Sequence, residues 1–274
     1  MTTPRLLSYD ISDRVTAFST TRHGGVSKGS HAQFNINYYC GDAPEAIEAN
    51  RKALCSLLGI DKTHLVYPHQ THGVEIRQIA PEFFPLEEET QKMLLEGVDA
   101  VMTDMTNVCI GVSTADCIPM ILYDPEHHAS CAVHAGWRGT VARIAQNAVR
   151  SMNTAYLTHP EKLRAVIGPG ISLKNFEVGD EVFQQFSEAG FDIPSIARRF
   201  PTLTSPTPDT HHPTPEKWHI DLWECNRQQL IAAGVRPENI QAAGICTYDN
   251  VEDFFSARRL GIESGRIFTG VILK

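Results

Sequence analysis

The clearest pattern along the chain is a pair of apolar runs joined by an Asp-Pro turn. The first run begins with Cys117-Ile118-Pro119, the turn is Asp124-Pro125-Glu126, and the second run ends at His134. Apolar runs on either side of such a turn are typical of a β-hairpin. With a midpoint near Glu126, antiparallel pairing would set Cys117 almost opposite His134, and facing side chains lie about 5 Å apart. The pattern therefore predicts that a thiol and an imidazole share one site.

Strand and helix patterns alternate along the rest of the chain. Alternating or continuous apolar runs predict strands over residues 15–22, 65–67, 74–79, 108–112, 164–168, 240–248 and 266–273. Apolar residues at helical spacing predict helices over 180–189 and after three residues that can cap a first turn, Asp42, Thr140 and Asp221. Helices and strands that are interspersed, with at least one hairpin, favour an α+β fold with mixed sheets over a doubly wound parallel sheet.

Length and composition narrow the class of protein. The 274 residues suffice for one large domain or two ordinary ones. Composition shifts only in the Pro- and Thr-rich segment 201–215, which we interpret as a surface loop because apolar segments continue on both sides. We therefore expect a single domain, 1–274.

The net charge of −8 argues against a general binder of nucleic acid or anionic membranes. The N-terminus has no apolar signal core, and no run is long enough to span a bilayer. Seven cysteines without a C-x-x-C pair do not form a secreted disulfide framework. Together these features predict a cytoplasmic protein with no membrane partner.

Three side chains are candidate metal ligands: His72, at the end of the loop Pro68-His69-Gln70-Thr71-His72, Cys117 and His134. Three protein ligands with a vacant fourth position is the pattern of a catalytic zinc site, where bound water reaches a pKa of about 7. The same ligands suit copper. Cys117 could instead be a nucleophile with His134 as its base. Asp116 could accept a proton, orient a water molecule or hold a ligand, and spacing alone does not choose among these alternatives.

Several motifs in this order resemble one known family. The motifs that carry the resemblance are, in order, STTRHGGVS, FNIN with GD, NR, HQTHG, VDAVMT, ADCIP, HAGWRG and IGPGI. With them the chain resembles the bacterial purine nucleoside phosphorylase family, also called the multicopper polyphenol oxidase or laccase-domain family. The resemblance covers nearly the whole chain. In relatives the first Asn of the second motif is usually followed by Leu-Gly and a His, whereas Ile36-Asn37-Tyr38-Tyr39-Cys40 follows Asn35 here.

The resemblance implies an αββα sandwich and a metal held by His72, Cys117 and His134, with zinc as the expected ion and copper as an alternative. It also implies phosphorolysis of adenosine, inosine, guanosine and methylthioadenosine, with adenosine deamination at the same site. The substrates would then be purine nucleosides and phosphate. On this basis we expect Asp116 to be catalytic and four side chains to contact phosphate or the nucleoside, namely Arg22, Asn35, Arg51 and Arg138.

Two other activities compete with this interpretation: a copper-dependent polyphenol oxidase, and a cysteine hydrolase acting on amide bonds of a peptidoglycan precursor. A laccase needs several coppers and many histidine ligands. The remaining histidine pairs, His127-His128 and His211-His212, fall in a turn and in the Pro-rich segment and form no second cluster. A non-catalytic binding module is the weakest alternative, because an open three-ligand site would serve it no purpose.

Overall fold

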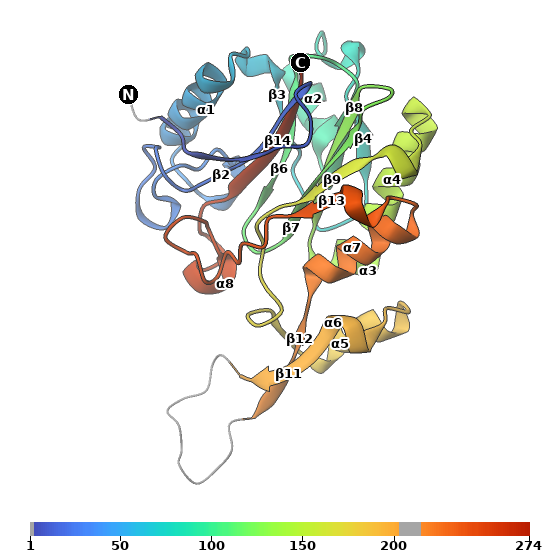
Figure 1. Cartoon of the computed structure of the whole chain (residues 1–274). Coiled ribbons are helices and arrows are strands. Elements are labelled where there is room, and N and C mark those ends of the chain that lie inside the picture. The colour runs from blue at the N-terminus through green and yellow to red at the C-terminus, as the bar shows by residue number, and fades with distance from the viewer. Residues whose placement is uncertain (1–2, 203–214) are drawn as a thin grey trace.

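A computed structural model of the chain describes residues 3–202 and 215–274. Its core is a pair of β-sheets packed face to face, each covered by helices on its outer side (Figure 1). This arrangement confirms the expected αββα sandwich. One sheet has the strand order β1 (Leu6–Tyr9), β2 (Val15–Thr20), β14 (Ile267–Leu273), β6 (Cys109–Thr114), β3 (Leu65–Val66). The other has the order β13 (Ile240–Ala242), β9 (Arg164–Ile167), β7 (Ile118–Asp124), β8 (Ala129–Ala135), β5 (Ala100–Thr103), β4 (Ile76–Gln78).

Both sheets contain parallel and antiparallel pairs, as the α+β interpretation predicted. Strand β3 runs parallel to β6, and β4 runs parallel to β5. The hairpin strands β7 and β8 are antiparallel. Most of the predicted strands are present. The segment 240–248 is the exception, because regular pairing stops at residue 242 and Cys246 forms only an isolated bridge with Gly170.

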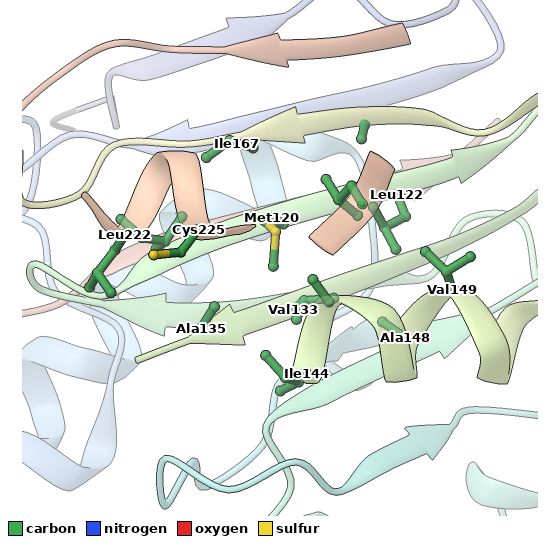
Figure 2. Close-up of a cluster of buried hydrophobic side chains, with 14 of the residues drawn as sticks. Met120, Leu122, Val133, Ala135, Ile144, Ala148, Val149, Ile167, Leu222 and Cys225 are labelled. Atoms are coloured by element: carbon green, nitrogen blue, oxygen red, sulfur yellow. The ribbon is translucent and has the colours of Figure 1, made fainter. Parts of the chain in front are cut away.

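The hairpin is buried on both faces, which explains its nearly continuous apolar sequence. Ile121 and Tyr123 point into the layer between the two sheets. Their neighbours Met120 and Leu122 point the other way, toward helices α4 (Ile144–Tyr156) and α7 (Leu222–Ala232), as Figure 2 shows. Burying a large aliphatic side chain contributes about 1.5–3 kcal/mol. The hairpin that delivers two candidate ligands is therefore among the most firmly fixed parts of the chain.

Helix α1 (Pro44–Leu58) covers the outer face of the five-stranded sheet, where Leu54 packs among Phe18, Phe268 and other buried residues. Its predicted start is wrong by one residue. Ala43 is the cap position because Pro44 takes the first helical position, and the Asp42 carboxylate instead binds Ser27 and the neighbouring loop.

The helix expected after Thr140 is two helices. Helix α3 (Trp137–Val141) begins directly behind Gly136, and α4 follows after Arg143, whose φ of 66° interrupts the helical backbone. Thr140 is therefore a residue of α3 and not a cap. The Asp221 cap is confirmed, since its carboxylate accepts the Glu224 N–H at 3.0 Å.

A smaller sheet projects from the sandwich (Figure 1) and contains β10 (Glu177–Val178), β12 (Glu216–Ile220) and β11 (Ala197–Pro201). The other helices are α2 (Glu88–Leu95), α5 (Asp180–Glu188), α6 (Ile193–Ile196) and α8 (Ala257–Leu260). Short 3₁₀ turns are Gly29–His31, Tyr38–Cys40, Lys62–His64, Pro81–Phe83, Pro160–Lys162 and Pro237–Asn239. Most of the predicted Pro-rich loop, 203–214, lies outside the described residues. Within the described ranges, every helix is too short or too polar to cross a membrane.

Candidate metal centre

The hairpin brings Cys117 and His134 together, although the predicted register is wrong. His134 pairs with Pro119, and Ala135 pairs with Ile118, so Cys117 lies two residues beyond the position opposite His134. The reason is that the loop between the paired strands takes four residues, 125–128, and shifts the midpoint past Glu126. Asp116, at a φ of 83°, turns the chain just before Cys117.

His72, Cys117 and His134 each offer one donor atom, and these three atoms lie within 4.8 Å of one another. Among the residues that the structure describes, this is the only group of three or more His, Cys, Asp or Glu donors so arranged. Zinc binds Cys sulfur at about 2.3 Å and His nitrogen at about 2.0 Å, so the three donors fit one tetrahedral ion after a small closure. His134 is buried and His72 is exposed, which leaves the centre accessible from one side.

Asp99 is a residue of this centre that the sequence interpretation missed. Its buried carboxylate accepts the Nδ1 proton of His134 at 2.7 Å, which leaves the other ring nitrogen of His134 for a metal. It also accepts backbone N–H groups of Thr71, His72 and Gly73. The available signal was the motif VDAVMT, since an Asp at the start of a buried strand needs partners of its own.

Cys117, His134 and Asp99 each shift the pKa of a neighbouring group toward its charged form. Burial on its own would raise the pKa of the Cys117 thiol, but His134 and His72 outweigh it and lower that pKa. Burial would likewise lower the pKa of His134, whereas Cys117 and Asp99 raise it. The pKa of Asp99 is lowered because its hydrogen bonds with His134 and the backbone outweigh its burial. Without a metal the centre thus favours a thiolate beside an imidazolium, and a divalent cation would take over the role of that proton.

Two glycines of the motif HAGWRG let the chain approach the centre closely. A Cβ at Gly136 would lie 2.6 Å from Cδ2 of His72 and 3.2 Å from Sγ of Cys117. A Cβ at Gly139 would lie 2.9 Å from the carbonyl oxygen of Gly73. Any side chain at these two positions would push the His72 loop away from the hairpin.

Asp116, predicted as catalytic, lies next to Cys117 but is not one of the three donors. Its Oδ1 accepts the hydroxyl of Thr247 at 2.6 Å, and its Oδ2 accepts the backbone N–H of Arg258 at 2.7 Å. Its own carbonyl accepts the N–H of Ile171 at 2.8 Å. The contacts anchor the turn that presents Cys117.

Two of the predicted substrate contacts are engaged within the protein. Arg22 donates to the carbonyls of Ala32 at 2.8 Å and Val251 at 2.6 Å. Asn35 is buried, and its amide donates to Asp42 at 2.9 Å and to the Asn37 carbonyl at 3.2 Å. Both side chains hold loops together in the structure.

The other two predicted contacts differ in exposure. Arg51 hydrogen-bonds the hydroxyl of Tyr67 and lies 3.5 Å from the Glu48 carboxylate, and its side chain is only 12% exposed. Arg138 is exposed at the start of α3, with its guanidinium 4.3 Å from the Trp137 ring centroid. Of the four, Arg138 has the guanidinium most available to an incoming anion.

His69, the first histidine of HQTHG, is not in the three-donor group. Its Nδ1 lies 2.8 Å from the Glu96 carboxylate, and its ring stacks on Tyr39 with centroids 3.8 Å apart. Only the second histidine of the motif reaches the centre. That His72 and not His69 binds a metal, as the resemblance implies, stays a prediction.

An αββα sandwich with an open Cys/His/His cluster at the end of its central hairpin defines a class of candidate metalloprotein. Residues 16–274 match the family described as multi-copper polyphenol oxidoreductase laccase, and the chain belongs to this family. The resemblance stated from the motifs is thereby confirmed.

Relatives of the chain carry two kinds of name. A protein of Bacteroides thetaiotaomicron named purine nucleoside phosphorylase is 40% identical over 272 residues, which cover 98% of this chain and 96% of that protein. A protein from an unknown prokaryotic organism named adenosine deaminase RL5 is 40% identical over 260 residues, which cover 95% of this chain and 94% of that one.

Solved structures share the fold over the full chain. The Bacillus licheniformis protein YfiH superposes with a TM-score of 0.87 at 28% identity and covers 99% of this chain and 97% of its own. YlmD of Geobacillus stearothermophilus gives a TM-score of 0.82 at 30% identity, with 97% and 94% covered.

Proposed function

We propose that the chain is a purine nucleoside phosphorylase that also deaminates adenosine, with both reactions at the His72, Cys117 and His134 centre. The observation that carries this proposal is the three-donor cluster, buried on one side and exposed on the other, within a chain 40% identical to relatives named for these two activities. Zinc is the expected ion, because two imidazoles and a thiolate with a free fourth position is a catalytic zinc ligand set.

Different residues would hold the metal, orient its ligands and bind phosphate. A bound zinc ion would supply a Lewis acid and a water nucleophile. His72, Cys117 and His134 would hold it, and Asp99 would keep His134 in the tautomer that binds metal. Phosphorolysis also requires a cation to bind phosphate beside the ribose, and we assign that contact first to Arg138 because its guanidinium is exposed just beyond Gly136.

The remaining predicted residues have supporting roles in this proposal. The Arg51 guanidinium contacts Tyr67 and Glu48 and is only 12% exposed, so it would donate to a phosphate or ribose oxygen only after leaving those partners. Arg22 and Asn35 would support the site through the loops that they hold. Asp116 would act by fixing the turn before Cys117.

A metal-free cysteine hydrolase is the second candidate. The charge arrangement favours a Cys117 thiolate beside a protonated His134, which is the pair that nucleophilic catalysis needs. A multicopper oxidase is disfavoured, because the described part of the chain contains one three-donor cluster and such an enzyme needs several metal sites.

The test is chromatography of the products formed from adenosine by zinc-replete protein, with and without phosphate. Adenine that appears only with phosphate supports phosphorolysis, and inosine that appears without phosphate supports deamination. If neither product forms, the proposed function is wrong. Cleavage of amide substrates by protein from which a chelator has removed the metal would then establish the cysteine hydrolase.

A further inference from the structure

We infer that Asp99 is the positioning residue of the centre. Its carboxylate holds both the backbone of the loop that presents His72 and the imidazole ring of His134. The inference depends on the proposed metal site and not on the reaction catalysed there. His72 comes from a loop and His134 from strand β8, 62 residues later, so their relative placement needs a common contact. Asp99 is the residue that touches both.

The contact with the His72 loop is made by consecutive backbone groups. The N–H groups of Thr71, His72 and Gly73 lie 3.3, 3.0 and 2.7 Å from the carboxylate oxygens of Asp99. Consecutive N–H groups that converge in this way form an anion-binding concavity, and here the anion is a side chain of the same chain. His72 has a φ of 64°, a left-handed backbone conformation that is unfavourable for a residue with a Cβ. The charged hydrogen bonds to Asp99 offset that cost.

The contact with His134 is made twice. The carboxylate accepts the ring Nδ1 proton at 2.7 Å, and the backbone carbonyl of Asp99 accepts the backbone N–H of His134 at 2.8 Å. Ring and main chain of His134 are therefore both fixed to the residue that holds the loop. Because Asp99 itself is fully buried, immediately before β5, water does not weaken these contacts.

An amide cannot replace this carboxylate. Asn in place of Asp99 would keep one acceptor oxygen, and its NH₂ group would face a neighbouring N–H donor. Loss of a group that orients a metal-binding His usually costs about 10–100-fold in metal affinity. We therefore expect Asp99→Asn to weaken zinc binding by about that factor.

The chain offers a matched control at the end of strand β7, away from Cys117. Asp124 is also fully buried, and it accepts the His127 Nδ1 proton at 2.9 Å and two backbone N–H groups at 2.9 and 3.2 Å. Asp124→Asn makes the same chemical change in the same kind of environment, but it touches none of the three donors. It therefore reports the general effect of losing a buried carboxylate.

The experiment measures zinc affinity by competition with a chromophoric chelator, in wild type, Asp99→Asn and Asp124→Asn. The inference predicts stoichiometric zinc in all three and a loss of about 10–100-fold confined to Asp99→Asn. Equal affinity in wild type and Asp99→Asn, or equal losses in the two variants, would overturn it. Wild-type protein without stoichiometric zinc would overturn the proposed metal site and this role with it.

A second measurement uses wild type alone, so it stands even where Asp99→Asn does not fold. Amide hydrogen exchange is followed at His72 and Gly73 in zinc-free and zinc-loaded protein. The inference predicts slow exchange in both forms, because Asp99 holds these N–H groups without the metal. Rapid exchange in the zinc-free form, slowed only by zinc, would show that the metal and not Asp99 orders the loop.

Discussion

The carboxylate of Asp116 accepts the backbone N–H of Arg258 at 2.7 Å, across 142 residues of sequence. This bond ties the residue before Cys117 to the first turn of α8, and the Thr247 hydroxyl holds the second oxygen of the same carboxylate. The turn that presents a metal ligand is thus fixed by the last part of the chain. Cys117 depends on contacts that its own hairpin does not supply.

Replacing Asp116 should therefore destabilise the protein in two separable ways. Asp116→Asn keeps a side chain that tolerates the φ of 83° but loses the charge, and we expect a loss of about 1–3 kcal/mol in the free energy of unfolding. Asp116→Ala should lose about 1–2 kcal/mol more, because Ala is strained at this φ. Urea unfolding of the purified variants measures both. Wild-type stability in the two variants would contradict the anchoring role.

A methyl group at Gly136 should disrupt the centre while the fold survives. The backbone of Gly136 has a φ of −70° and suits any residue, so Gly136→Ala acts only by contact with His72 and Cys117. Overpacking of about 1–3 kcal/mol predicts a loss of about tenfold or more in zinc affinity. Gly29→Ala is the control, since it introduces backbone strain at a φ of 60° where a Cβ meets no atom within 4 Å. Similar zinc affinity in both variants would show that the His72 loop and the backbone at Gly136 do not need to lie this close.

Arg138 and Arg22 should respond differently to substitution by Ala. Arg138 is exposed, so Arg138→Ala should leave stability unchanged and raise the phosphate KM by about tenfold or more, the value of one charged hydrogen bond. Arg22→Ala leaves two carbonyls without their donor and should lower the free energy of unfolding by about 1–3 kcal/mol. Phosphate titration and urea unfolding of both variants separate the roles. An unchanged phosphate KM in Arg138→Ala would remove Arg138 from phosphate binding.

The bound metal should be zinc, at one ion per chain, and Cys117→Ala should reduce it. Elemental analysis of protein purified without added metal measures the content. Treatment with a chelator should abolish the reaction, and zinc should restore it, because three protein donors are enough to rebind one ion. Activity that copper restores and zinc does not would instead favour an oxidase.

The fold was largely predictable because its signals are local. A hairpin with apolar strands, caps such as Asp221 and a closing apolar strand follow from period and turn chemistry. The motifs carried the assignment of His72, Cys117 and His134, and the structure brings all three together.

The errors arose where tertiary contacts decide. The hairpin register depends on a four-residue loop that the sequence leaves ambiguous, and the break between α3 and α4 coincides with the left-handed backbone of Arg143, which no sequence pattern marks. Asp99 was missed because its four partners come from distant segments and three of them are backbone groups, which have no sequence signature. Whether Arg51 and Arg138 contact substrate stays a prediction.

The rate of phosphate-dependent adenine formation from adenosine in wild type, Cys117→Ala and Cys55→Ala decides whether the reaction takes place at this centre. Cys55 is a buried thiol on α1 outside the three-donor cluster, so its variant controls for the loss of a cysteine. We expect adenine and ribose 1-phosphate from wild type and Cys55→Ala, and neither product from Cys117→Ala. Adenine formation that survives in Cys117→Ala would contradict the assignment of the reaction to this centre.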